Sequence, residues 1–179
     1  MNTVSVTMRS RELEIQRNMN EAIIKARIDV AKGHLASNQN LLERSAAGVE
    51  PEASLKRAGP DGNNFNWLVG HIVASRDGLA RGLGGEGVVP SEIVSKYQRS
   101  APLPVGEETP LAELVELSAL TREAVTAQLD TASPEFLASS SPLDMNMLEY
   151  AEFLVWHDTY HTGQAAVYRR MMGLDGVIG

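Results

Sequence analysis

The stretch from Phe153 to Gly173, FLVWHDTYHTGQAAVYRRMMG, decides the fold because it has the spacing of one long amphipathic helix. His157 and His161 stand four residues apart in it, and Gln164 follows one turn later. These positions share one face of an α-helix, since 3.6 residues complete a turn. A buried polar group without a partner costs roughly 1–3 kcal/mol. Three such groups in one stripe therefore need a common explanation.

The rest of the chain has three further segments with helical spacing and no alternating strand pattern. The sequence therefore predicts an all-α four-helix bundle, with helices over residues 12–45, 65–84, 111–129 and 145–172. We expect a single domain over residues 1–179, in which the more polar residues 1–20 are either a helical arm or a frayed end. Asn63 or Asn64 is the predicted N-cap of the second helix, and Thr109 that of the third.

The periodicity also predicts which positions face the core. In the first three helices these are Ile24, Ile28, Ala31, Leu35, Asn38 and Leu42, then Leu68, His71 or Ile72, Ser75 and Leu79, then Leu111, Leu114, Ser118 and Val125. In the last helix they are Met147, Tyr150, Leu154, His157, His161, Gln164, Tyr168 and Met171. Trp67 and Trp156 are expected in the core. The irregular residues 84–108 are typical of a lid, an active-site wall or a hidden short helix.

Composition narrows the function classes. The chain has 179 residues, of which 22% are charged, and a net charge of −7. An acidic balance argues against a nucleic-acid or anionic-membrane binder. The absence of cysteine excludes disulfides, thiolate zinc sites and cysteine nucleophiles. The first twenty residues lack the apolar core of a signal peptide, and no apolar run approaches membrane-spanning length, so we expect a cytoplasmic protein.

The histidine pair favours a metal site, because two imidazoles at this spacing can point at one ion. A third ligand has to come from upstream, since neither histidine nor glutamate follows His161. His71 belongs to the inward stripe of the second helix, whereas His34 only flanks the stripe of the first helix. The predicted ligands are therefore His71, His157 and His161. Three histidines leave positions open for water or substrate, and they suit Zn²⁺, Ni²⁺, Cu²⁺ or Fe²⁺. The alternative is that each histidine bonds a carbonyl or hydroxyl and only packs.

Two segments, NWLVGHIVAS at residues 66–75 and HDTYHTGQ at residues 157–164, resemble the DinB/YfiT-like family of metalloenzymes. The resemblance implies an up-down-down-up four-helix bundle, often dimeric, that holds Ni²⁺ or Zn²⁺ with His71, His157 and His161. Members include S-transferases that use bacillithiol, mycothiol or glutathione, and a thiol-dependent isomerase. A zincin peptidase is disfavoured, because HDTYH has Asp158 in place of the glutamate and no third ligand follows it.

The leading hypothesis is a metal-dependent transferase that activates a low-molecular-weight thiol for attack on an electrophile, with residues 84–108 as part of the substrate wall. Asp158, Gln164 and Tyr168 are the candidate catalytic residues. Asp158 is either a base or a supporting carboxylate, while Gln164 and Tyr168 either orient a bound thiol or water or bond each other. A non-catalytic metal- or ligand-binding stress-response protein is the alternative.

Overall fold

The computed structural model describes residues 3–60 and 62–178, with side chains from Glu14 onward; Met1 and Asn2 of the predicted arm lie outside the described residues. The described helices are α1 (Thr3–Ala46), α2 (Pro51–Ser54), α3 (Phe65–Gly82), α4 (Ser91–Lys96), α5 (Leu111–Thr131), α6 (Pro134–Leu137) and α7 (Met147–Met171). Extended pairing among the described residues is limited to two isolated bridges, Arg57 with Asn64 and Ser140 with Asn146. The predicted all-α class is therefore confirmed.

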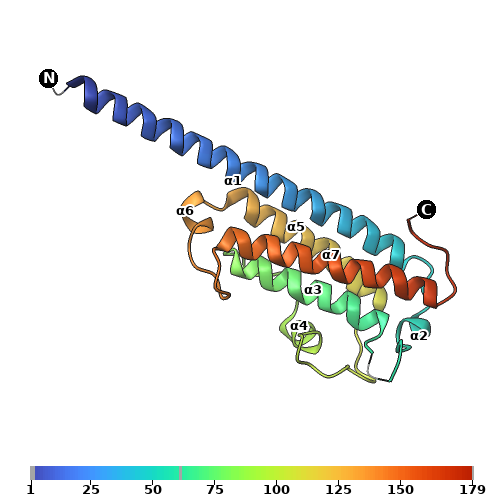
Figure 1. The fold of residues 1–179 in the computed structure, drawn as a ribbon. Helices are drawn as coiled ribbons and strands as arrows, with labels where there is room; N and C mark the ends of the chain where they lie inside the picture. The colour runs from blue at the N-terminus through green and yellow to red at the C-terminus, as the bar shows by residue number, and fades with distance from the viewer. Residues whose placement is uncertain (1–2, 61, 179) are drawn as a thin grey trace.

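The long helices α1, α3, α5 and α7 lie side by side as a four-helix bundle (Figure 1). Arg27 of α1 pairs with Glu152 of α7, and Asn38 donates further along to Thr159, so these two helices run in the same direction. Helices α3 and α5 both run the opposite way (Figure 1). The long connection between α3 and α5 returns the chain to the end where α3 began, and it contains the short helix α4.

The helix starts show which predicted caps form. Asn64 accepts a hydrogen bond from the backbone of α3 and is its N-cap, and Asn146 forms a capping box at the start of α7. The prediction for Thr109 was wrong, because Pro110 occupies the cap position of α5 without a side-chain bond. Thr109 is buried instead, and its N–H donates to the hydroxyl of Tyr97.

The predicted core positions of α1, α3 and α5 are buried or half-buried, but the core stripe of α7 is shifted. Its buried residues are Met147, Leu148, Ala151, Val155, Asp158, Thr162 and Ala165. His157 and His161 are only half-buried, and Met171 is exposed. The prediction followed the larger side chains, whereas from Ala151 to Ala165 the buried face consists of smaller ones. Trp156, predicted in the core, is 61% exposed.

Helix α1 extends well past the bundle at its N-terminal end (Figure 1). Residues 3–20 are a continuous part of this helix, and the side chains from Glu14 to Ile23 are all exposed. The short helices α2 and α6 begin at Pro51 and Pro134, where proline suits the first turn. None of the described helices is long and apolar enough to cross a membrane.

Candidate metal centre

The bundle brings together the three predicted ligands from two antiparallel helices. His71 comes from α3, and His157 and His161 come from α7, with possible ligand nitrogens all within 4.8 Å of one another. The Nε2 atoms of His157 and His161 are 3.0 Å apart. Metal–nitrogen bonds of about 2.0–2.1 Å place two nitrogens of one ion roughly 3–3.5 Å apart. The spacing of this pair therefore fits two ligands on a single ion, and without an ion it also fits a hydrogen bond between the two rings.

Hydrogen bonds orient two of the rings. The Nδ1 atom of His71 lies 2.8 Å from the carbonyl oxygen of Tyr97, to which it donates, so Nε2 carries no proton. Likewise, Nδ1 of His161 lies 2.8 Å from the side-chain oxygen of Gln164 and donates to it. Gln164 in turn donates to the hydroxyl of Tyr160 at 3.0 Å. Partners of this kind fix the tautomer that presents Nε2 to a metal.

His157 differs from the other two histidines in its hydrogen bonding. Its Nδ1 atom is buried and has no hydrogen-bond partner among the described residues. If the histidines only packed, each ring would need such a partner to offset its desolvation. The three rings are therefore not a set of fully satisfied core histidines, and the other nitrogen of His157, Nε2, lies beside Nε2 of His161.

The electrostatic environment keeps the rings neutral. Desolvation by burial is the main cause that lowers the pKa of His71 and of His157, and it lowers the pKa of His161 to about 4. The positive charge of Arg99 lowers the pKa of His71 and His157 further. All three imidazoles are thus unprotonated near pH 7, which is the form that binds metals.

The triad opens into a cavity of about 710 Å³ between α3, α7 and the segment around α4. Its apolar and aromatic walls are formed by Trp67, Val94, Tyr150, Phe153, Leu154 and Tyr160. Trp67 stacks on His71 with ring centroids 4.7 Å apart. Gln98 and Arg99 also line the cavity, so residues 84–108 do form part of its wall.

Sequence reasoning missed how this wall is attached to α3. Tyr97 is fully buried, and its hydroxyl donates to Asn66 while its carbonyl holds His71. A Cβ at Gly70 would overlap the Tyr97 ring. Glycine inside a helix costs about 1 kcal/mol relative to alanine. A glycine directly before a candidate ligand was the available signal for this close approach.

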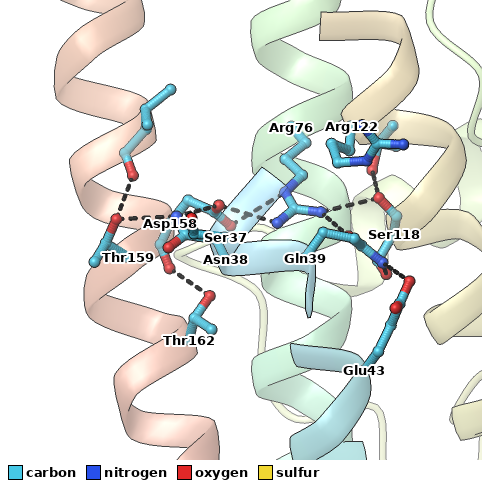
Figure 2. Close-up of polar contacts among 12 residues, drawn as sticks. Ser37, Asn38, Gln39, Glu43, Arg76, Ser118, Arg122, Asp158, Thr159 and Thr162 are labelled. Atoms are coloured by element: carbon cyan, nitrogen blue, oxygen red, sulfur yellow. Dashed lines mark hydrogen bonds and ion pairs between the residues drawn. The ribbon is translucent and has the colours of Figure 1, made fainter. Parts of the chain in front are cut away.

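The structure does not place Asp158 in the lining of the cavity, which favours the predicted supporting carboxylate over the predicted base. Asp158 is buried on the core face of α7, where Arg76 donates to its two carboxylate oxygens at 3.1 and 3.0 Å (Figure 2). Asn38 donates to the same carboxylate at 2.8 Å. These partners fix the carboxylate in the core, where it joins α7 to α3 and α1.

Arg76 connects all four long helices. Besides Asp158 of α7 it donates to Gln39 of α1 and to the backbone carbonyl of Ser118 of α5 (Figure 2). Arg76 lies on the same helix as His71, and Asp158 directly follows His157. The ion pair therefore sets the position of α3 against α7, on which the distance between the ligands depends.

Of the other two candidate catalytic residues, only Gln164 lies at the site. It lines the cavity and bonds His161. The hydroxyl of Tyr168 donates to the carbonyl of Asn63 at 3.0 Å, and its ring lines a separate cavity beside α2. Gln164 and Tyr168 thus do not bond each other. The guanidinium of Arg169 donates to backbone carbonyls, among them that of Asp175 in the segment after α7.

Together the fold and the triad define an all-α bundle with a candidate three-histidine metal centre open to a cavity. The chain belongs to the DinB superfamily, whose family model matches residues 34–165. Among solved structures it is similar to YfiT from Bacillus subtilis, described as a probable metal-dependent hydrolase with an unusual four-helix bundle topology. The TM-score is 0.60 at 17% identity, over 83% of this chain and 89% of that chain. At this identity the likeness shows a shared fold. No curated protein gives a significant match.

Proposed function

We propose that the chain is a metal-dependent enzyme that binds one divalent ion, Ni²⁺ or Zn²⁺, through His71, His157 and His161 and transfers a low-molecular-weight thiol to an electrophile. The observation that carries the proposal is the convergence of three neutral imidazoles at the wall of an open cavity. An ion bound there would lower the pKa of a thiol or water beside it.

The cavity's own residues favour a thiol that carries an anionic group. Arg99 supplies a positive charge in the wall, and the aromatic side chains of Trp67, Phe153 and Tyr160 offer surface to an apolar electrophile. The described lining residues contain no carboxylate, and Asp158 is held by Arg76. A thiol, with a free pKa of about 8.5, ionises with less help from a protein base than water does.

Hydrolysis is the second candidate. It is supported by the shared fold with YfiT, which is described as a probable metal-dependent hydrolase. The hydrogen-bonded pair of Gln164 and Tyr160 beside His161 could orient a water molecule. The two candidates differ in whether turnover requires an added thiol.

The test is turnover by protein loaded with Ni²⁺ or Zn²⁺, using a generic electrophile with bacillithiol, mycothiol, glutathione or 2-mercaptoethanol, and ester substrates without thiol. We expect metal-dependent consumption of thiol and electrophile together, abolished in His157→Ala. Arg99→Gln should raise KM for an anionic thiol and leave KM for 2-mercaptoethanol unchanged. Ester cleavage without thiol would favour hydrolysis. Absence of any turnover would favour the non-catalytic metal- or ligand-binding alternative.

A further inference from the structure

The cavity at the triad is a long groove along the contact of α3 with α7. One side runs from Asn63, just before α3, to Gly78, and the other runs from Tyr150 to Gln164. Because the two helices are antiparallel, Gly78 lies toward Tyr150 and Asn63 lies toward Gln164. At a rise of 1.5 Å per residue, each side is roughly 20 Å long. The triad occupies the middle, so the groove extends from it in both directions.

The two halves of the groove differ in polarity. The half toward Asn63 contains the amide of Gln164 and the hydroxyl of Tyr160, which are hydrogen-bonded to each other. The described lining residues of the other half carry no charge and are mostly apolar. We call this half the apolar arm, and its lining residues are Ala74, Ser75, Gly78, Val94, Tyr150, Phe153 and Leu154.

The segment that contains α4 runs back along α3 from the apolar arm to the triad. Asp77 of α3 accepts a hydrogen bond from the backbone of Val89 at 3.0 Å, and the carbonyl of Tyr97 accepts one from the α3 histidine of the triad at 2.8 Å. Val94 lies between these two contacts and lines the arm. Arg99 follows the second contact, and its positive charge adds to the effect of burial in lowering the pKa of two triad histidines. The positive charge of the groove therefore lies at the triad and outside the arm.

Gly78 leaves the apolar arm open. His71, Ser75 and Gly78 lie on one face of α3, because they follow one another in steps of four and three. A side chain at position 78 would therefore point into the groove, and its Cβ would meet no atom within 4 Å. The arm ends about one turn further along, where the ring of Tyr150 lies 3.8 Å from the position of a Cβ at Gly82. From His71 to Gly78 the arm is roughly 10 Å long.

We propose that the apolar arm binds an apolar substituent of the electrophile, up to roughly 10 Å long, while the reactive atom faces the triad and the anionic group of the thiol lies toward Arg99. The inference rests on the proposed function, because it requires an ion at the triad. Burial of an apolar substituent is favourable in proportion to its area. A charged substituent would lose its hydration in the arm without gaining a partner. Gly78 then determines specificity, since a larger residue there would fill the arm without touching the metal ligands.

A series of straight-chain hydroxamates tests the arm without any need for turnover. The hydroxamate group ligates divalent ions, and the chain lengthens from acetohydroxamate through butanehydroxamate and hexanehydroxamate to octanehydroxamate. Isothermal titration of Zn²⁺-loaded protein gives the affinity for each. We expect the affinity to rise about two- to fourfold per added methylene group until the arm is filled.

Variants locate the bound chain. Gly78→Leu should bind acetohydroxamate as tightly as the original protein and lose most of the gain for the longer probes. Ser75→Leu, one turn nearer the triad, should end the gain at a shorter chain. Gly33→Leu is the matched control, because Gly33 is an exposed helical glycine of α1 whose Cβ would also meet no atom within 4 Å, and it should keep the full gain. Each variant should bind Zn²⁺ with unchanged affinity.

The outcomes separate the arm from the metal centre. If acetohydroxamate binds but longer chains bind no more tightly, or if Gly78→Leu and Ser75→Leu keep the full gain, the inference about the arm is wrong and the metal centre stands. If not even acetohydroxamate binds to protein supplied with Zn²⁺, the proposed metal-dependent function fails and the inference fails with it.

Discussion

At the residue scale, the position of the proton on each imidazole decides whether the triad can bind an ion. Tyr97 and Gln164 hold the Nδ1 protons of His71 and His161, which leaves Nε2 of each ring as a ligand. The sequence spacing predicted the three histidines and Gln164 as residues of one site. It could not predict the carbonyl of Tyr97, because that contact depends on how a long connection folds back onto α3.

Gln164→Ala should lower metal affinity about 10- to 100-fold, the usual effect of removing the group that orients a histidine ligand. The His161 ring then loses its hydrogen-bond acceptor and samples orientations that do not point Nε2 at the ion. Isothermal titration with Zn²⁺ or Ni²⁺ gives the affinity. Gln98→Ala is the control, since Gln98 lines the cavity without bonding a histidine. Equal affinity in both variants would show that Gln164 does not orient the ligand.

Metal affinity should depend on pH with a defined sign. Burial lowers the pKa of each ligand below 6.5, to about 4 for His161, so protons compete with the ion only in acid. Affinity should be level from pH 8 to about pH 6.5 and fall below that, with a slope greater than one proton per ion as successive ligands protonate. Competition titrations at several pH values measure it. An affinity that stays flat from pH 8 to below pH 4 would contradict an all-histidine site.

The same shifts affect the metal-free fold. Unfolded histidine binds its proton near pH 6.5, whereas folded His161 binds one only near pH 4. The unfolded state therefore holds more protons between these values, and the stability contributed by the neutral ring is lost as the pH falls through this range.

At the element scale, the contact between α3 and α7 decides the distance between the ligands. The sequence predicted both helices and their approximate ends, since caps and apolar spacing are local signals. It did not predict which face of α7 is buried. Asp158 lies in the core because Arg76 and Asn38 of other helices donate to its carboxylate, and such pairing between distant residues leaves no periodic signal. Thr162 is satisfied there by its own helix, since its hydroxyl donates to the backbone carbonyl of Asp158.

Arg76→Met should destabilise the protein by about 3–5 kcal/mol, because it leaves the Asp158 carboxylate buried without its ion-pair partner. The double variant Arg76→Met with Asp158→Leu should recover most of that loss, since no charge then remains unpaired. Urea unfolding followed by circular dichroism gives both free energies. A single variant as stable as the original chain would show that the ion pair does not hold α3 against α7.

At the scale of the whole molecule, the hydrophobic core and the metal centre are separate sources of stability. Two buried apolar clusters extend over the bundle, one beside the triad and one at the opposite end. The sequence predicted this core from four helical stripes. It left open whether residues 1–20 form a helical arm or a frayed end, and from Thr3 onward they are a continuous part of α1 that projects beyond the bundle.

Chelation of the ion should leave the bundle folded. The apolar core is much larger than the three-ligand site, unlike the core of a zinc finger, which cannot fold without its ion. We expect the helical circular dichroism at 25 °C to stay unchanged on addition of a chelator, with a lower melting temperature at most. Collapse of the helical signal would make the site structural.

The metal centre itself is tested most directly by elemental analysis of protein purified without a His-tag or chelator, followed by titration of the stripped protein. The expected result is one divalent ion per chain, with binding lost about equally in His71→Ala and His157→Ala and retained in His34→Ala, whose ring is exposed outside the triad. Protein that contains no metal and binds neither Zn²⁺ nor Ni²⁺, or that loses the ion in His34→Ala but keeps it in His71→Ala, would contradict the three-histidine centre.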